Sequence, residues 1–267
     1  LAGAGRSGEL HGVLPAGGEV NPPACVLFDL DGTLLDTAPD LAAALNRLRR
    51  ERGEPELPFA LIRPTVSHGS PGMLKASFGV DADHPLYPEL NQRFLTLYQE
   101  FIAVETALFP GMAEVLAHLE AQTIPWGVVT NKPGFLTEPL LKALGLWARA
   151  VCVVSGDTLD KRKPDPEPLW YACEQAGVDP GRSLYVGDAE RDVQAGNRAG
   201  MIALAAAFGY LDAEDRPHEW GAAGVLGQPA DLFRWLGKTI PAIRASSAPA
   251  VATTAQTGMP PTAPIIR

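Results

Sequence analysis

Residues 24 to 33 decide the fold, and they read Ala24-Cys25-Val26-Leu27-Phe28-Asp29-Leu30-Asp31-Gly32-Thr33. An apolar run that ends at acids and a glycine predicts a buried β-strand followed by a sharp turn. Side chains alternate between the two faces of a strand, so Asp29 and Asp31 are expected to point the same way. Two carboxylates this close repel each other unless a cation lies between them or one keeps a proton. The Thr33 hydroxyl is expected to hold the turn.

Acidic stretches with a glycine also occur in solvated loops and in calcium-binding loops. A calcium loop that began at Asp29 would need glycine at its sixth position and a carboxylate, usually Glu, at its twelfth. Those positions hold Leu34 and Asp40. The spacing therefore argues against a calcium loop, and the rest of the chain must decide between a solvated loop and a functional site.

Beyond Thr106, short apolar runs alternate with segments of helical periodicity. Strands are expected at 126–130, 150–154, 183–187 and 201–205, and helices at about 112–122, 134–145, 166–177 and 190–199. Together with the run at 24–29, this alternation predicts an α/β fold, a doubly wound, Rossmann-like parallel sheet covered by helices. Residues 23–36 and 106–237 would form this core domain.

Residues 37–105 carry helical patterns and no convincing strand. The pattern Thr37-x-x-Asp40, with Pro39 in the first turn, predicts the start of a helix. Two apolar faces follow at helical spacing, one of Leu41, Leu45 and Leu48, the other of Leu90, Phe94, Leu97, Tyr98 and Phe101. An all-helical insert placed directly after the first strand predicts a cap domain over the carboxyl end of that strand.

Composition limits the classes of partner. Residues 1–22 are expected to form a flexible extension without a signal peptide, and the Ala/Pro/Thr-rich residues 238–267 a disordered tail. A net charge of -9 over 267 residues argues against nucleic acid and anionic membrane as partners. The three cysteines, Cys25, Cys152 and Cys173, are expected to be reduced core residues of a cytoplasmic protein.

Polar residues follow consecutive predicted strands: Asp29 and Asp31, then Thr130 and Asn131, then Lys163 before Pro164, then Asp188 and Asp192. The carboxyl ends of parallel strands share one edge of the sheet, so these side chains are expected to meet in a crevice. Asp29, Asp188 and the backbone carbonyl of Asp31 are suitable ligands for Mg²⁺. The Thr130 hydroxyl, the Asn131 N–H and the Lys163 ammonium are suitable donors to a bound phosphate. Each group alone is ordinary in a turn, but their joint order favours a functional site.

In this combination the residues resemble the four signatures of the haloacid dehalogenase superfamily of phosphatases. The signatures are Asp29-Leu30-Asp31-Gly32-Thr33, Thr130-Asn131, Lys163-Pro164 and Gly187-Asp188-x-x-x-Asp192. The resemblance spans residues 24 to about 236, and the insert resembles the helical cap of one subclass. Within that subclass the chain is similar to bacterial phosphoglycolate phosphatases. The amino-acid sequences of segments 126–133, 163–168 and 190–192 most resemble those of the branch that includes N-acetylmuramic acid 6-phosphate phosphatases.

The resemblance implies a Mg²⁺-dependent phosphatase that works through an aspartyl-phosphate. Asp29 would be the nucleophile and a metal ligand, and Asp31 the general acid and base and a second metal ligand. Asp188 would complete the metal set, while Asp192 would orient Lys163, which binds phosphate and assists catalysis together with the phosphate-binding Thr130 and Asn131. Dehalogenating relatives lack the second acid of the first signature, so Asp31 favours phosphoryl transfer.

Two phosphate monoesters that carry a carboxylate are the expected substrates: 2-phosphoglycolate and N-acetylmuramic acid 6-phosphate. Related caps often carry Gly-Ala-Arg where this chain has Gly69-Ser70-Pro71, so an arginine expected at the substrate carboxylate is missing. Arg63 and His68 are the candidates for cap specificity. A phosphosugar mutase and a non-enzymatic phosphate-binding protein remain the alternatives, and the protein is expected to be a monomer or a homodimer.

Overall fold

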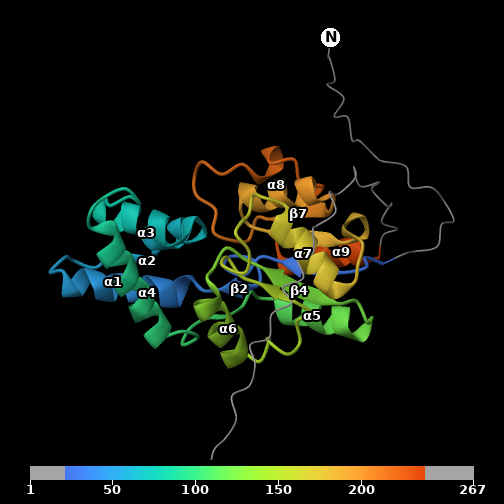
Figure 1. Cartoon of the computed structure of the whole chain (residues 1–267), viewed down its shortest axis with the longest axis horizontal. Helices are drawn as coiled ribbons and strands as arrows, with labels where there is room; N and C mark the ends of the chain where they lie inside the picture. The colour runs from blue at the N-terminus through green and yellow to red at the C-terminus, as the bar shows by residue number, and fades with distance from the viewer. Residues whose placement is uncertain (1–21, 238–267) are drawn as a thin grey trace, which may run out of the picture.

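The computed structural model describes residues 22–237, which form a sheet-containing lobe and a helical lobe (Figure 1). The predicted tail at 238–267 and the predicted extension at 1–22, apart from Pro22, lie outside the described residues. No helix in the described part of the chain is long and apolar enough to cross a membrane.

The sheet has six parallel strands in the order β5-β4-β1-β6-β7-β8. Their bounds are β1 Val26–Phe28, β4 Trp126–Val129, β5 Val153–Val154, β6 Leu184–Gly187, β7 Ile202–Ala206 and β8 Gly224–Leu226. The order reverses next to β1, and ligands of doubly wound sheets bind at such a switch point. The α/β fold class and five of the strands are as predicted, whereas β8 was not predicted.

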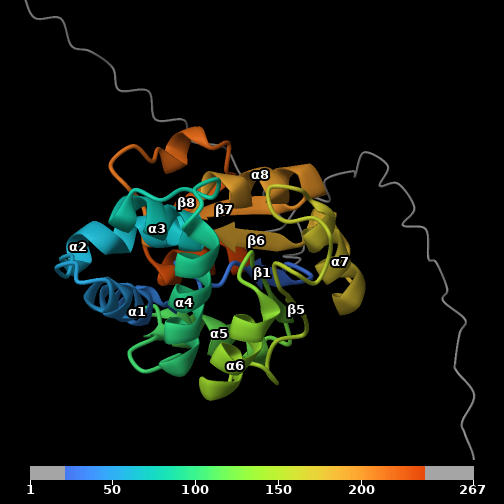
Figure 2. The same ribbon diagram turned by 60° about the vertical axis from the view of Figure 1, so that its left-hand side comes forward.

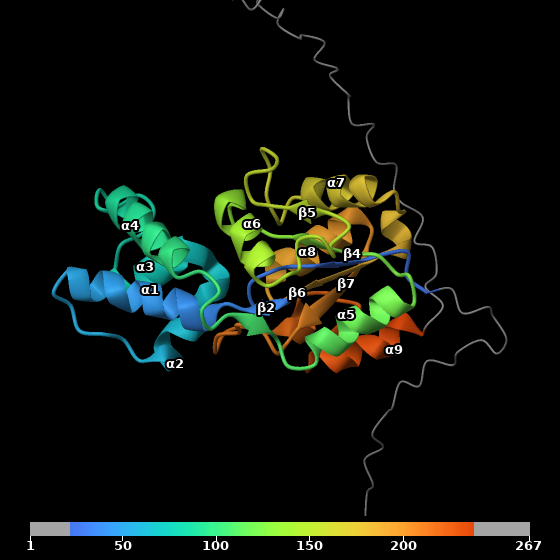
Figure 3. The same ribbon diagram turned by 90° about the horizontal axis from the view of Figure 1, so that it is seen from below.

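Helices cover both faces of the sheet, as Figure 3 shows in edge view. Val26 and Phe28 of β1 pack with α5 (Met112–Ala121), α6 (Gly134–Ala143) and α9 (Phe233–Leu236). Cys25 and Leu27 point to the opposite face and pack with α7 (Glu167–Ala176) and α8 (Glu190–Ala199). All three cysteines are free thiols, and burial raises the pKa of Cys173 to about 12. This two-sided burial explains why the strands are apolar at every position instead of every second one.

The helical lobe comprises α1 (Ala38–Glu51), α2 (Phe59–Ile62), the 3₁₀-helix η1 (Arg63–His68), α3 (Gly69–Phe78) and α4 (Tyr87–Glu100). When this lobe is turned toward the viewer, α4 crosses in front of the sheet (Figure 2). The predicted apolar faces of α1 and α4 are buried, with the exception of Phe101. Phe101 lies just past the end of α4, 42% exposed, under the Arg47 guanidinium.

The two lobes are joined by a short antiparallel pair, β2 (Leu35–Asp36) with β3 (Ala107–Leu108). The helix α1 starts where predicted, although its N-cap residue Thr37 makes no side-chain capping hydrogen bond. Thr37 instead donates its hydroxyl to Asp31. The buried Asp40 carboxylate accepts the backbone N–H groups of residues 104, 105 and 106. Asp40 therefore ties the start of the helical insert to its end.

Candidate active site

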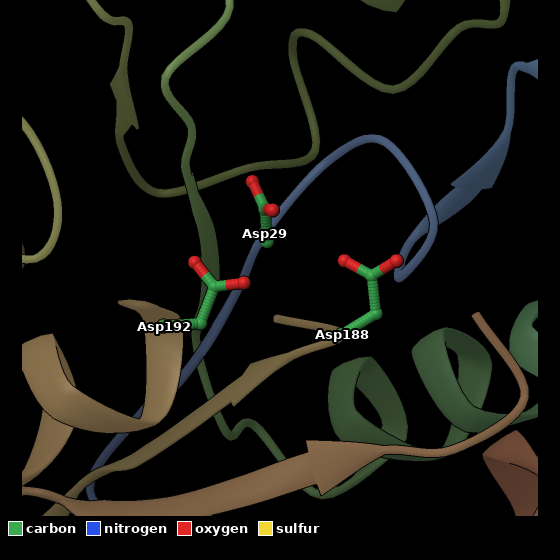
Figure 4. A group of neighbouring side chains, drawn as sticks. All are labelled: Asp29, Asp188 and Asp192. Atoms are coloured by element: carbon green, nitrogen blue, oxygen red, sulfur yellow. The ribbon is translucent and has the colours of Figure 1, made fainter. Parts of the chain in front are cut away.

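Three buried carboxylates meet at the carboxyl ends of β1 and β6, from Asp29, Asp188 and Asp192 (Figure 4). One oxygen of each lies within 4.8 Å of the others. Asp29 directly follows β1, Asp188 directly follows β6, and Asp192 lies in the first turn of α8. The neighbouring β1 and β6 therefore bring together acids that are about 160 positions apart in the sequence.

The Asp29 side chain has one occupied and one available oxygen. Its Oδ1 accepts the Leu30 N–H at 2.7 Å and lies 2.9 Å from the Lys163 ammonium. No hydrogen bond is made to its Oδ2 by the residues that the structure describes. Burial raises the pKa of Asp29, and the nearby Lys163 opposes this rise. The arrangement leaves one oxygen of a fixed carboxylate facing the cavity.

Lys163 is the cation at the centre of the carboxylates, with its side chain only 1% exposed. Its ammonium lies 2.7 Å from Asp192 Oδ1 and donates to the Tyr185 hydroxyl at 2.7 Å. Asn131 holds the backbone of Lys163 through both side-chain atoms, at 3.0 Å and 3.1 Å. Lys163 thus has fixed partners on every side, which is what a buried ammonium requires.

Asp31 is held apart from the three clustered carboxylates. Its Oδ1 accepts the Thr37 hydroxyl at 2.6 Å and the Lys132 ammonium at 2.9 Å. Burial disfavours the charge of Lys132, but Asp31 and Tyr98 outweigh burial and raise the pKa of this lysine. Among the predicted metal ligands, Asp31 therefore has its carboxylate engaged elsewhere, so only its backbone carbonyl fits that role.

Asp188 lies in a tight pocket of backbone and cap groups. Its Oδ2 accepts the Ser67 hydroxyl at 2.7 Å and the Tyr210 N–H at 2.8 Å. A Cβ atom on Gly32, whose φ is +82°, would lie 2.0 Å from the same oxygen, so this turn requires glycine. The neighbouring Thr33 hydroxyl is buried without a partner in the described chain, so the prediction that it holds the turn was wrong.

The oxygen Oδ1 of Asp188 is buried and has no hydrogen-bond partner among residues 22–237. Burial, with Asp29 and Asp192 as further causes, raises the pKa of Asp188 to about 7. A buried carboxylate oxygen without a donor, beside two more acids, is costly unless a cation is bound. Hard oxygen donors of this kind suit Mg²⁺. Asp29 and Asp188 fit a divalent cation, whereas Asp192 is engaged by Lys163.

Stability should depend on pH through Asp188. The folded carboxyl holds its proton to about pH 7 and the unfolded one only to about pH 4, so the folded state binds more protons between these values. With a chelator present, the free energy of unfolding should fall by up to about 4 kcal/mol as pH rises through this window, and about 3 kcal/mol of this fall should lie between pH 5 and pH 8. Saturating Mg²⁺ should reverse the fall. Urea unfolding at pH 5 and pH 8, with EDTA or Mg²⁺, measures both effects.

The control is Asp188→Asn, which keeps the shape of the side chain and cannot titrate. Its stability in EDTA should vary much less between pH 5 and pH 8, and Mg²⁺ should stabilise it less. An equal dependence on pH in both proteins would place the titrating group elsewhere.

A cavity of about 460 Å³ lies between the two lobes, directly above Asp29 and Asp31. Thr130, Asn131 and His68 line it, but Arg63 does not. Arg63 instead donates to the Gly209 carbonyl at 3.1 Å and stacks over the Tyr210 ring. The geometry thus assigns Arg63 to the contact between cap and core. His68 pairs with Asp212 at 3.6 Å and is 53% exposed, so it borders the cavity at its rim.

The structure also places four residues at the site that were not among the predicted site residues: Ser67, Lys132, Tyr185 and Arg191. Arg191 lines the cavity, and the acids Asp192, Asp29 and Asp188 raise its pKa although burial opposes this. Lys132 and Arg191 each adjoin a recognised signature, which was the available signal. Ser67 adjoins His68, a predicted candidate for cap specificity, whereas Tyr185 had no such signal because it lies in the interior of a strand.

Comparison with known proteins identifies relatives along most of the chain. The chain is 42% identical over 215 residues to an N-acetylmuramic acid 6-phosphate phosphatase of Pseudomonas aeruginosa, covering 80% of this chain and 95% of the relative. It is 42% identical over 214 residues to a phosphoglycolate phosphatase of Xanthomonas campestris, covering 79% and 95%.

A solved structure of a predicted phosphoglycolate phosphatase from Haemophilus somnus superposes with a TM-score of 0.70 at 26% identity. It covers 79% of this chain and 96% of its own. A family model for haloacid dehalogenase-like hydrolases matches residues 26–206. These similarities confirm the resemblance drawn from the four signatures, and the chain belongs to the haloacid dehalogenase-like hydrolases.

Proposed function

We propose that this protein is a Mg²⁺-dependent phosphatase that hydrolyses a sugar-sized phosphate monoester through an aspartyl-phosphate on Asp29. The observation that carries the proposal is the division of labour between two acids. Asp29 offers a free oxygen beside the Lys163 ammonium, while Asp31 is held separately by Thr37 and Lys132. One carboxylate is thus arranged for attack and the other for proton transfer.

The reaction would proceed in two displacements. Oδ2 of Asp29 attacks phosphorus in line with the ester oxygen, and the P–O ester bond breaks as the Asp–O–P bond forms. The carboxyl group of Asp31 gives its proton to the departing alkoxide. Asp31, now a carboxylate, takes a proton from a water molecule that attacks phosphorus and releases Asp29. Only Oδ1 of Asp31 is bonded to Thr37 and Lys132, which leaves Oδ2 for the proton.

Charge neutralisation would come from both sides of the phosphate. The Thr130 side chain lines the cavity, and its hydroxyl would donate to a phosphate oxygen. Lys163, whose backbone Asn131 fixes, would act beside Asp29, which its ammonium contacts at 2.9 Å. Asp29, Asp188 and the carbonyl of Asp31 would hold Mg²⁺. The bound Mg²⁺ would reduce the repulsion between the anionic nucleophile and the anionic phosphate. Asp192 would position Lys163, which it contacts at 2.7 Å.

Cavity size favours the larger of the two candidate substrates. Sites for ligands of drug or sugar size typically enclose about 300–1,000 Å³, and this cavity of about 460 Å³ lies in that range. 2-Phosphoglycolate has roughly nine non-hydrogen atoms and N-acetylmuramic acid 6-phosphate roughly 24, so only the sugar ester would fill the cavity. The Pseudomonas relative that bears the sugar phosphatase name supports this choice. The free, buried thiols of Cys25 and Cys173 are compatible with the cytoplasm as the compartment.

A panel of phosphate monoesters with Mg²⁺ tests the proposal. We expect kcat/KM for N-acetylmuramic acid 6-phosphate to exceed that for 2-phosphoglycolate by at least about 100-fold, because only the former uses the whole cavity for binding. The reverse order would make the protein a phosphoglycolate phosphatase. Turnover that requires a sugar bisphosphate would identify a mutase, and no turnover on any ester would favour a phosphate-binding protein.

A further inference from the structure

Two buried polar side chains on α4 have hydrogen-bonding capacity that no residue between 22 and 237 fills. Oδ1 of Asn91 is buried and receives no hydrogen bond within the described chain. The Tyr98 hydroxyl is also buried; its oxygen interacts with the Lys132 ammonium, but its proton has no acceptor among the described residues. Buried polar groups are nearly always paired in native proteins, and an unpaired one costs about 1–3 kcal/mol. Such groups call for an explanation in terms of a ligand or a structural role.

Both residues line the cavity above Asp29. They are seven positions apart on α4, which is two helical turns, so they lie on the same face with Cα atoms separated by about 10 Å. The wall between them is apolar and includes Phe94 and Leu95. On the cavity side of α4, the polar groups of Asn91 and Tyr98 therefore lie at opposite ends of an apolar surface formed by Phe94 and Leu95.

The two points lie at different depths in the site. Tyr98 is near the reacting groups, because the Lys132 ammonium lies 4.4 Å from the centre of its ring and contacts Asp31. Asn91 is two turns further into the cap. A ligand that has its phosphate at Asp29 and also reaches Asn91 must be long, and a two-carbon glycolate does not have that length.

We propose that Asn91 and Tyr98 form a subsite of the cap that binds the leaving group of a sugar-sized phosphate ester, an inference that rests on the proposed phosphatase function. The Tyr98 hydroxyl donates to an oxygen of the ligand near the phosphate. Asn91 pairs with a hydroxyl or amide N–H at the far end of the ligand. If the Asn91 amide is turned over, its NH₂ group takes the buried position and needs an acceptor, so the site remains polar in either orientation.

This subsite supplies a recognition element where the family resemblance leads one to expect an arginine. Asn91 and Tyr98 are uncharged, so they select for hydroxyl and amide groups and do not require a carboxylate. A site that hydrogen-bonds a ligand strongly rejects analogues that leave its polar atoms unpaired. Long, hydroxylated esters should therefore be preferred over short acidic ones.

Asn91→Leu and Tyr98→Phe test the subsite, because each removes polar atoms with little change in volume. We expect Asn91→Leu to lower kcat/KM for N-acetylmuramic acid 6-phosphate by about 10- to 100-fold, and Tyr98→Phe to lower it by about 10-fold. In Asn91→Leu, hydrolysis of p-nitrophenyl phosphate and 2-phosphoglycolate should change by less than about threefold, since neither ligand reaches Asn91. Gln92→Leu is the matched control, because Gln92 is an exposed amide on the same helix, and it should leave every rate unchanged.

Two further measurements separate the subsite from fold effects and from the proposed function. Asn91→Leu should unfold at the same or higher urea concentration, because it removes an unpaired buried atom; a large loss of stability would indicate a structural role instead. Binding of the sugar phosphate to Asp29→Asn, measured by calorimetry with Mg²⁺, should weaken about tenfold or more when Asn91→Leu is added. Unchanged binding would overturn the subsite even if the protein is a phosphatase. Wild-type protein that hydrolyses no ester would instead overturn the phosphatase function.

Discussion

Asp29→Asn is expected to reduce kcat by at least about 10⁴-fold against every phosphate ester, while the protein stays folded. An amide is a far weaker nucleophile than a carboxylate and cannot form the aspartyl-phosphate. The fold should survive because Lys163 keeps Asp192 as its charged partner at 2.7 Å. Steady-state rates on p-nitrophenyl phosphate, together with urea unfolding, measure the two effects. Activity within tenfold of the wild type would remove the covalent mechanism.

Asp31→Asn provides the matched comparison, since it makes the same replacement of a carboxylate by an amide at the neighbouring acid. This variant should lose the proton transfer but keep the nucleophile, so an ester with a good leaving group should still phosphorylate Asp29. Mass spectrometry after a brief reaction with p-nitrophenyl phosphate should find the phosphoryl group in Asp31→Asn and not in Asp29→Asn. A label in neither variant would show that Asp31 does more than move protons.

Lys163→Met should have the second largest effect, because it damages both the chemistry and the fold. Removing the ammonium leaves Asp29 and Asp192 buried without their cation, at side-chain exposures of 5% and 0%. Breaking a buried ion pair by removing one partner typically costs about 3–5 kcal/mol. The same change removes a cation from the phosphate, so kcat/KM should fall by at least about 10³-fold.

The double variant Lys163→Met/Asp192→Asn separates the two losses. Neutralising Asp192 removes one of the stranded charges, so part of the lost free energy of unfolding should return, while activity stays low. Urea unfolding and turnover of the single and double variants complete the cycle. Recovery of activity in the double variant would mean that Lys163 acts only by balancing the charge of Asp192.

The parallel fold and most of the carboxylate site were predictable, because they follow from where strands end. Asp29, Asp188 and Asp192 each stand directly after an apolar run or in the next helical turn, and adjacent parallel strands carry such positions to one edge. Local sequence patterns are sufficient to predict these positions, because a residue that directly follows a parallel strand must lie at the carboxyl edge of the sheet. The strand β8 was missed because its apolar run is only Val225 and Leu226, which lie between Gly224 and Gly227.

The remaining contacts depend on tertiary neighbours that no local pattern specifies. Thr37 and Asp40 fit the pattern of a helix cap, yet each found a partner outside the helix. Lys132 pairs with Asp31, which is 101 positions away. Arg63 is long enough to reach several surfaces, and only the arrangement of cap and core decides that it binds the Gly209 carbonyl. The sequence shows that such residues are polar, but it does not show which partner each of them binds or whether it belongs to the site.

The clamp formed by Asp40 has a consequence for how specificity diversifies. The chain crosses between the lobes twice, and the two crossings lie side by side. They are joined by the β2–β3 pair and by the Asp40 carboxylate, which accepts the backbone N–H groups of residues 104–106. The chain between these two crossings is an insert, and the sheet-containing lobe holds both of its ends in place. Sequence changes inside the insert, except at residues such as Ser67 that contact an acid directly, should therefore leave the strand ends and their acids in place. The sheet-containing lobe can therefore carry many different helical inserts. Exchanging the insert changes the residues that recognise the substrate and leaves the catalytic residues unchanged.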